Sequence, residues 1–381
     1  MCTTLYACTE SQSNSAMCPF SIRQVNNTTY LIRERDEFGE FPHIYVKKCS
    51  QTDAAGRHTS VLLINDTGVG TSAARCLKHP PWNINSFIEH HLNPNGDIPY
   101  LVLLSHCHYD HILGLNSLLQ SQNEIGAQAD TPSQVQIASS AHGRLFTTPY
   151  TNLQEHSLCN NLGCSAPKYQ TSKWAADHAP IVYSHPSGVT MSLPIITMHT
   201  PGHTPDSLSW LDVEEQTLYV GDSFYEQQSE DSRNAPWGPE DPASILFTKE
   251  SDLSDWWQSL NRLIDFVKRS GEEFGQPVKL AAGHVTAEVN ALEFLAQIKH
   301  FMMKVLTDKL TFARQPDKRG EAFGHWSDQT NERFSLGAPL RVVEDGRRRI
   351  LEEGSFRMHV ATYLVDVWPS SRLYLTFNYR N

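Results

Sequence analysis

Residues 105–111 read SHCHYDH and directly follow the apolar run YLVLL at 100–104. Imidazole and carboxylate groups add nothing to the packing of a strand end, so four of them in seven residues indicate a binding site. In an extended chain, residues two apart point to the same side, so His106 and His108 can hold one cation together. Asp110 and His111 follow where the chain turns, and they would face a neighbouring position. The spacing therefore predicts two adjacent cation-binding positions.

Short apolar runs that predict β-strands lie on both sides of this cluster. They are FSIRQV (20–25), TTYLIRE (28–34), HIYVKK (43–48), VLLIND (61–66), VQIAS (135–139), PIITMHT (194–200), SLSWLDV (207–213), TLYVGD (217–222) and VKLAAG (278–283). Helices are expected at 83–91, around 116–122, at 251–270 with Ser251 as N-cap and Gly271 as stop, and at 286–311. Strands grouped before helices, twice over, predict two β-plus-α halves packed in layers.

The composition is that of a globular chain with an acidic balance. Of its 381 residues, 39% are hydrophobic, and 42 acidic residues against 31 basic ones give a net charge of −11. A nucleic-acid footprint normally appears as a basic patch, so no nucleic-acid partner is expected. No stretch of 18 apolar residues occurs, and the N-terminus lacks the pattern of a signal peptide, so neither a membrane span nor secretion is expected.

The eight cysteines are scattered along the chain. In a chain of this length we interpret them as free thiols of a cytoplasmic protein, although Cys159 and Cys164 are close enough to pair. Cys107 lies between two histidines of the cluster and should point away from them, so we expect it to pack in the core.

The cluster resembles the HxHxDH signature of the metallo-β-lactamase superfamily. That family carries a further histidine in a PGHT-like turn, an aspartate that ends a strand, and a last histidine after another strand. Here TPGHTPDS supplies His203, YVGDSFY supplies Asp222 and LAAGHV supplies His284, in the family's order. LLINDTG resembles the family's strand-to-turn element, with Asp66 as a supporting residue. The resemblance covers roughly residues 40–300.

The resemblance implies two divalent metal ions. It places His106, His108 and His203 on one ion, and Asp110, His111 and His284 on the other, with Asp222 bridging them. Two such ions about 3.5–4 Å apart share a hydroxide whose pKa falls to roughly 7. Imidazole and carboxylate ligands without a thiolate suit zinc, the expected metal, and also iron and manganese.

The fold implied is an α/β, four-layer αββα sandwich. We expect residues 1–18 to be a disordered tail, 19–311 to form the catalytic domain, and 312–381 to be an extension of unknown role. The interval of 92 residues between His111 and His203 is long for the family, so about 112–190 is expected to be an insertion near the mouth of the site.

Asp222 also narrows the function. The β-lactamases proper lack the bridging aspartate, so antibiotic hydrolysis is disfavoured. Tyr225, three residues further on, resembles the tyrosine that acyl-homoserine lactonases aim at the substrate carbonyl, where a phenol would stabilise an oxyanion by about 3–4 kcal/mol. These features predict a hydrolase of a lactone or related ester, acting on a small molecule, with Asp110 and Tyr225 as catalytic residues. Packing of Tyr225 at a strand end is the competing interpretation.

Three alternatives stay open at this point. A glyoxalase II-like thioesterase would use the same two ions, and a sulfur dioxygenase would use one iron held by His106, His108 and His203. A binding protein without turnover is the third. The substrate, the metal and the oligomeric state do not follow from the sequence.

Overall fold

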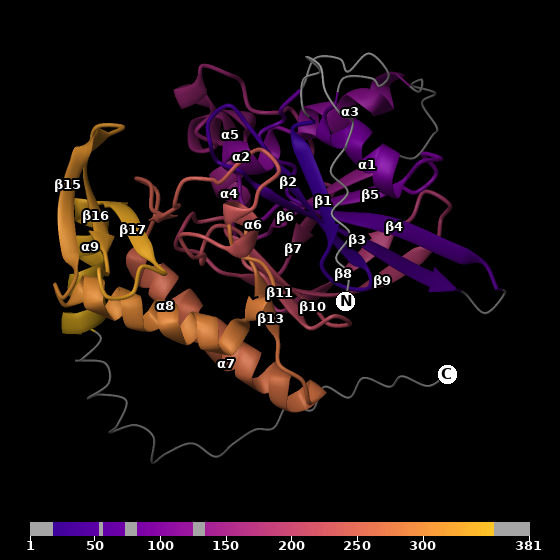
Figure 1. Cartoon of the computed structure of the whole chain (residues 1–381). Coiled ribbons are helices and arrows are strands. Elements are labelled where there is room, and N and C mark those ends of the chain that lie inside the picture. Colours follow the sequence, from indigo (N-terminus) through magenta and orange to yellow (C-terminus); the bar gives the residue numbers. More distant parts are fainter. Residues whose placement is uncertain (1–17, 53–55, 73–81, 125–133, 354–381) are drawn as a thin grey trace.

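The computed structural model describes residues 18–52, 56–72, 82–124 and 134–353 of the chain (Figure 1). The tail predicted at 1–18 falls outside these ranges except for Cys18, and so does the end of the chain after residue 353. Within the described ranges, no helix combines the length and the apolar composition that a membrane crossing requires.

Seven strands, paired in chain order, form the first sheet. Neighbours are antiparallel from β1 to β4 and parallel from β4 to β7. The parallel centre is buried on both faces, which is why YLVL in β5 reads as an unbroken apolar run. The strands are β1 (Phe20–Gln24), β2 (Thr29–Glu34), β3 (His43–Thr52), β4 (His58–Asn65), β5 (Tyr100–Leu103), β6 (Val135–Ser140) and β7 (Lys173–Ala175).

Six strands form the second sheet, in the order β14-β13-β11-β10-β9-β8. Only β11 and β13 run parallel to each other. The strands are β8 (Ala179–Ser184), β9 (Thr190–His199), β10 (Leu208–Asp212), β11 (Thr217–Tyr219), β13 (Lys279–Ala281) and β14 (Val289–Asn290).

The two sheets pack against each other, and helices cover their outer faces. Alternate residues of β5 show this: Leu101 and Leu103 join a core cluster with Trp210 of the second sheet, whereas Tyr100 and Val102 join the cluster on the helical side. The first sheet is covered by α1 (Ile84–Leu92), α2 (Tyr109–Ile112), α3 (Leu115–Glu124) and the shorter α4 (Arg144–Thr147), α5 (Tyr150–His156) and η1 (Cys159–Leu162).

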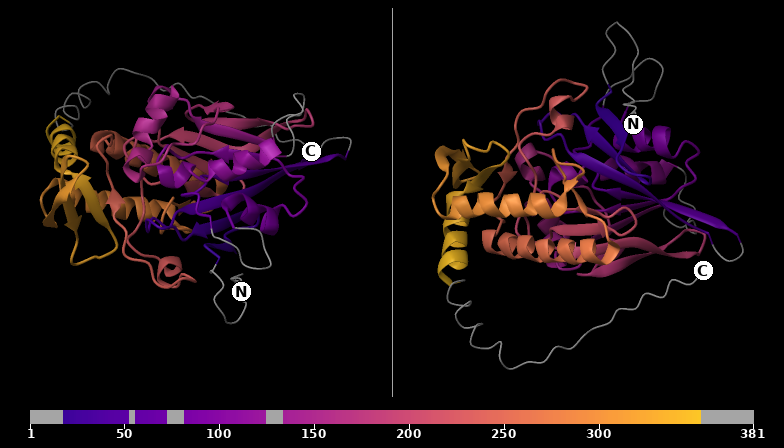
Figure 2. Two further views of the ribbon diagram at one scale, coloured as in Figure 1. Left: turned by 90° about the horizontal axis from the view of Figure 1, so that it is seen from above. Right: turned by 60° about the horizontal axis from the view of Figure 1, so that its bottom comes forward.

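Two long helices cover the second sheet: α7 (Leu253–Phe274) and α8 (Ala291–Leu306), which lie side by side in Figure 2. The order of layers is therefore helix, sheet, sheet, helix, and the predicted four-layer α/β sandwich is confirmed. The ends predicted for α7 were wrong. Asp252 caps the helix by accepting from the Asp255 amide, and Gly275, with φ 65°, ends it.

Residues 112–190 were expected to be an insertion near the site mouth, and those that the structure describes, 112–124 and 134–190, contribute regular elements to both halves of the sandwich. They supply β6 and β7 at one edge of the first sheet, α3, and β8 at the edge of the second sheet. The described part of the chain between His111 and His203 thus completes the first sheet and begins the second.

The C-terminal residues form a third, four-stranded sheet in the order β12-β17-β16-β15. Three strands are consecutive, β15 (Thr311–Lys318), β16 (Glu321–Ser327) and β17 (Ser335–Pro339), and α9 (Leu340–Arg347) and η2 (Arg348–Glu353) follow them. The fourth, β12 (Ile245–Leu246), comes from the middle of the chain. Trp326, Phe334 and Leu336 are buried in the same core cluster as α7 and α8. The residues predicted to form a C-terminal extension, which are described as far as residue 353, therefore pack in the same hydrophobic core as α7 and α8.

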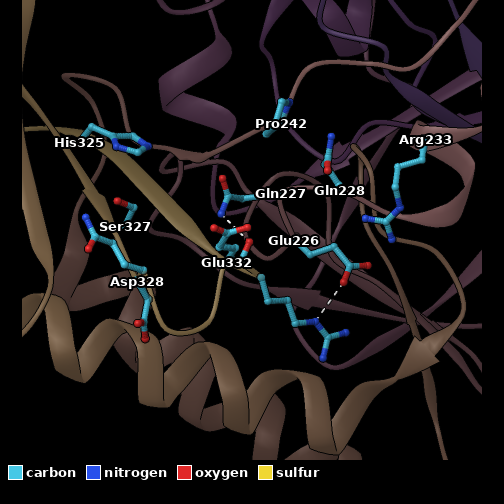
Figure 3. A pocket seen from close by; sticks show the side chains of 11 residues that line it. Glu226, Gln227, Gln228, Arg233, Pro242, His325, Ser327, Asp328 and Glu332 are labelled. Atoms are coloured by element: carbon cyan, nitrogen blue, oxygen red, sulfur yellow. Dashed lines mark hydrogen bonds and ion pairs between the residues drawn. The ribbon is translucent and has the colours of Figure 1, made fainter.

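A polar cleft of about 680 Å³ separates this third sheet from the segment that follows Tyr225 (Figure 3). One wall carries Glu226, Gln227 and Gln228, and the other carries His325 and Asp328. The short helix α6 (Glu230–Arg233) continues from the first wall. At the base of the cleft the two sides are in contact, because the Gln227 amide donates to the Arg333 carbonyl at 2.9 Å and Arg333 Nε donates to Glu226 Oε2 at 3.0 Å.

Candidate metal centre

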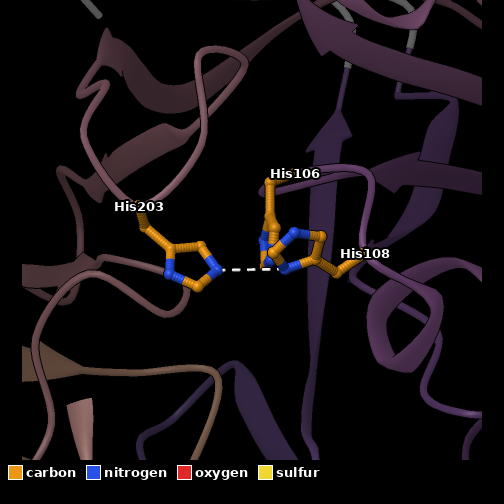
Figure 4. Close-up of side chains that lie close together, drawn as sticks. All are labelled: His106, His108 and His203. Atoms are coloured by element: carbon orange, nitrogen blue, oxygen red, sulfur yellow. Dashed lines mark hydrogen bonds between the residues drawn. The ribbon is translucent and has the colours of Figure 1, made fainter. Parts of the chain in front are cut away.

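The seven residues predicted as ligands form two adjoining groups. His106, His108 and His203 make one group (Figure 4), and Asp110, His111, Asp222 and His284 make the other. Within each group, one ligand atom from every residue lies within 4.8 Å of the others, and all seven side chains are buried. The structure thus brings together every residue that the sequence predicted as a metal ligand.

The three histidines of the first group converge although they come from two distant segments. His106 and His108 follow β5, and His203 follows β9 across the junction of the two sheets. His203 Nε2 lies 3.1 Å from His108 Nδ1, and the His106 ring lies 4.6 Å and 4.8 Å from the other two ring centroids. Imidazole nitrogens directed at one point are suited to holding a divalent cation.

In the second group, Asp222 lies between the two sets of ligands. Its Oδ2 is 3.1 Å from His111 Nε2 and 3.2 Å from His284 Nε2. The same oxygen is 3.8 Å from both His106 Nε2 and His203 Nε2 in the first group. One carboxylate oxygen therefore faces both cation positions, as a bridging ligand must.

Asp110 completes the second group from the first turn of α2. Its Oδ2 lies 3.2 Å from His111 Nε2 and 3.1 Å from His284 Nε2. Cys107 points away from these ligands and is 1% exposed in the core, as predicted.

Several buried atoms here have no hydrogen-bond partner within the described residues. They are His106 Nε2, His108 Nε2, His111 Nε2 and Asp222 Oδ1. A buried polar atom left without a partner costs about 1–3 kcal/mol, so His106 Nε2 and His111 Nε2, which lie 3.8 Å and 3.1 Å from Asp222 Oδ2, require compensation. Divalent cations at the two positions would supply it, and we conclude that the residues present fit such ions.

Asp66 fixes the second imidazole nitrogen of one ligand. Its Oδ2 is 3.0 Å from His111 Nδ1, and its Oδ1 accepts a hydrogen bond of 2.7 Å from the Ser105 amide. Asp66 has φ 61°, which aspartate tolerates better than most residues. The supporting role predicted for Asp66 agrees with this geometry, because a ligand imidazole held at Nδ1 presents Nε2 to a cation.

Two other ligands are held by backbone carbonyls. His203 Nδ1 donates to the Leu246 carbonyl at 2.9 Å, and His284 Nδ1 donates to the Glu40 carbonyl at 2.8 Å. Sequence reasoning missed both partners, since a carbonyl acceptor leaves no mark on residue type. The only feature of the sequence that marks Glu40 is its place in the turn FGEFP between β2 and β3.

Burial and the neighbouring carboxylates shift the pKa of the ligand histidines in opposite directions in the two groups. Burial holds the pKa of His106, His108 and His203 below the usual value, so these rings are neutral and keep a lone pair for a cation. Burial alone would also lower the pKa of His111 and His284, but the nearby carboxylates raise it well above the usual value. A cation that binds there displaces protons from these two rings.

The pKa of both carboxylates in the second group stays low. Burial by itself would raise the pKa of Asp110 and Asp222, but the adjacent His111 and His284 hold both well below the ordinary value. These groups are therefore ionised at neutral pH and available as anionic ligands.

Tyr225 is buried beside the second group, and its ring centroid lies 5.7 Å from that of His284. Its hydroxyl donates to the Ser244 carbonyl at 2.6 Å and accepts from the Leu246 amide at 3.2 Å. Both partners are backbone groups of the segment that contains β12.

Comparisons with known proteins give relatives of low identity. No protein-family model matches the chain. A protein of Aspergillus versicolor named "Putative transcription factor avaE" is 28% identical over 344 residues, which is 88% of this chain and 90% of that protein. An uncharacterized protein of Bacillus subtilis, YobT, is 28% identical over 123 residues, 32% of this chain and 45% of that one.

The similar solved structures are of metallo-β-lactamase-fold proteins. One, a metallo-β-lactamase family protein from Thermus thermophilus, is 17% identical, covers 75% of this chain and 83% of its own, and has a TM-score of 0.41. A metallo-β-lactamase from Pontibacter korlensis is 12% identical, with 74% and 97% covered and a TM-score of 0.43. A β-lactamase domain protein from Burkholderia ambifaria is 14% identical, with 76% and 75% covered and a TM-score of 0.45.

Proposed function

We propose that this chain is a metal-dependent hydrolase of the metallo-β-lactamase superfamily, with two divalent metal ions, zinc being the expected one. The position of Asp222 carries the proposal, because its Oδ2 lies within 3.8 Å of ligand nitrogens in both groups. A structural cation would need only one closed set of ligands. Two adjoining sets that share a carboxylate are typical of hydrolytic centres.

Two ions held in this way would lower the pKa of a bound water towards neutrality and polarise the oxygen of a substrate carbonyl. The protein's own part is to hold the ligands rigidly in a buried site, so that little reorganisation is needed during the reaction. Asp110 is ionised and lies against both His111 and His284. We propose that Asp110 accepts the proton that the attacking water loses and then donates it to the leaving alkoxide.

The substrate proposed is a lactone or related ester. A thioester would undergo the same attack, so a substrate panel must separate the two. The catalytic role predicted for Tyr225 would require its hydroxyl to leave both Ser244 and Leu246. Its present contacts favour the competing interpretation, in which Tyr225 supports the site through packing and hydrogen bonds.

The name of the Aspergillus versicolor protein raises a second function, in transcription. We do not adopt it for this chain, because the net charge of −11 offers no electrostatic support for DNA binding. The convergence of seven buried ligand residues points to chemistry at a metal centre.

The test is hydrolysis of a panel of lactones, esters and thioesters by purified protein, before and after removal of metal with a chelator. We expect turnover of at least one acyl class, its loss on chelation and its recovery when zinc, iron or manganese is added. Turnover that survives complete metal removal would contradict the proposal. Oxygen consumption with a persulfide substrate and one iron would instead support the sulfur dioxygenase.

A further inference from the structure

The strand β12 connects the third sheet to the metal centre. The Leu246 carbonyl accepts the hydrogen bond from His203 Nδ1, which leaves His203 Nε2 directed at His108. The backbone of His203 is held separately, since Ser251 Oγ donates to its carbonyl at 2.6 Å. The orientation of the His203 ring therefore depends on where β12 places one carbonyl.

The Tyr225 hydroxyl holds β12 from one side. It donates to the Ser244 carbonyl and accepts from the Leu246 amide, so one oxygen bonds the residues before and within the strand. Tyr225 is 5% exposed, whereas Ser244 and Leu246 are half-buried, so both bonds are partly shielded from water. Removing this hydroxyl would leave the partly buried Leu246 amide and Ser244 carbonyl without this partner.

The strand β17 holds β12 from the other side. The two strands pair in parallel, and the Phe247 amide donates to the Gly337 carbonyl at 2.8 Å. Side chains add to this, because Ser244 Oγ lies 2.8 Å from Ser335 Oγ and 3.3 Å from His325 Nε2. His325, which lies on β16, also lines the cleft in Figure 3.

We propose that the C-terminal sheet and Tyr225 act together, through β12, to set the ring of His203 and so the affinity of the first cation position. Tyr225 is then a positioning residue, and the third sheet is a structural part of the metal centre. This inference rests on the proposed function for the existence of two bound ions, but not on any substrate.

The experiment compares Tyr225→Phe with wild type and with Tyr183→Phe in cobalt(II) titrations followed by visible absorption. Tyr183 is a suitable control because its hydroxyl is also fully buried but has no hydrogen-bond partner within the described residues. His203→Ala identifies the absorption bands of the first position. We expect wild type to bind two ions, and Tyr225→Phe to bind the His203-dependent ion roughly tenfold more weakly with the other ion unchanged. Tyr183→Phe should match wild type.

Hydrogen exchange at the Leu246 amide gives a second reading that does not depend on metal. It should be faster in Tyr225→Phe, while amides in β5 and β10 keep their protection. If Tyr225→Phe does not fold, Ser335→Ala decides, because it removes only the side-chain bonds of β17 to Ser244 and Ala243. A selective, roughly threefold weakening of the first ion is then expected.

The outcomes separate this inference from the proposed function. The inference would be overturned, and the proposed function left standing, if wild type and a folded Tyr225→Phe bind both ions equally well. Where Ser335→Ala decides, the same result with that variant has the same meaning. A wild type that binds no ion would overturn both. A loss confined to the second position would also contradict the inference.

Discussion

The ligands from the two halves of the molecule are positioned by different means. The first half supplies His106, His108, Asp110 and His111 from one short segment between β5 and α2. The second half supplies His203, Asp222 and His284 from three separate strand ends. In the first half, side chains such as Asp66 orient the ligands, and in the second half backbone carbonyls orient two of the three.

This difference determines which substitutions can change the orientation of each ligand. A side-chain partner is removed by one substitution, whereas a carbonyl partner changes only when the element that carries it moves. The first-half ligands should therefore respond to changes in neighbouring side chains. The second-half ligands should respond to changes in elements distant in sequence, such as β17.

Asp222→Ala should have the largest effect, because this residue faces both halves. We expect both ions to bind at least roughly 100-fold more weakly and turnover to fall to background, since a direct ligand matters more than its supporting partner. Elemental analysis and activity measure this. Asp328→Ala is the control, since that aspartate bonds Lys304 in the C-terminal region and should leave both ions in place. An active Asp222→Ala variant that lacks metal would refute the bridging role.

Asp66→Ala should weaken only the ion of the second group, by roughly 10–100-fold, because the His111 ring loses the partner at Nδ1. Cobalt(II) titration would show one tight and one weak ion. Asp66→Asn should recover only part of the loss, since asparagine tolerates φ 61° but offers one acceptor oxygen to the two donors, the Ser105 amide and His111 Nδ1. Equal weakening of both ions would mean that the two halves are not independently supported.

Ser105→Ala should have a smaller effect on the first group. Ser105 Oγ lies 3.0 Å from His106 Nδ1, but the Ser105 amide keeps its bond to Asp66 in the variant. We expect the first ion to bind less than roughly tenfold more weakly. A larger loss than in Asp66→Ala would reverse the ranking proposed for these partners.

Glu34 should affect stability and its pH dependence rather than the binding of either ion. Its carboxylate accepts from the Val69 and Thr71 amides, just after Asp66, and burial raises its pKa to about 7. Folded protein then binds more protons than unfolded chain between about pH 4.5 and 7, so this group's contribution to stability falls as pH rises through that window. The change is on the order of 3–4 kcal/mol.

Glu34→Gln should remove that slope. Thermal unfolding between about pH 4.5 and 8 measures it, and we expect a flatter profile for the variant than for wild type. An unchanged slope would show that Glu34 is ionised throughout the window and that burial does not control it.

The sequence allowed the seven ligands, Asp66 and the layered fold to be predicted because each ligand ends an apolar run, and strand ends meet at one edge of a sheet. It did not allow the placement of 112–190, since β7 has only three residues and becomes a strand by pairing with β6. The two-residue strand β12 likewise exists only through β17. The bonds of the Tyr225 hydroxyl depend on these same distant contacts, so spacing alone could not distinguish support from catalysis.

Metal content per chain, measured by elemental mass spectrometry on protein purified without added metal, tests the central claim most directly. The two-group centre predicts close to two divalent ions per chain in wild type and at most one in Asp222→Ala, held by the three histidines of the first group. Two ions retained in Asp222→Ala would contradict the account, because the two groups would then not depend on a shared bridging carboxylate.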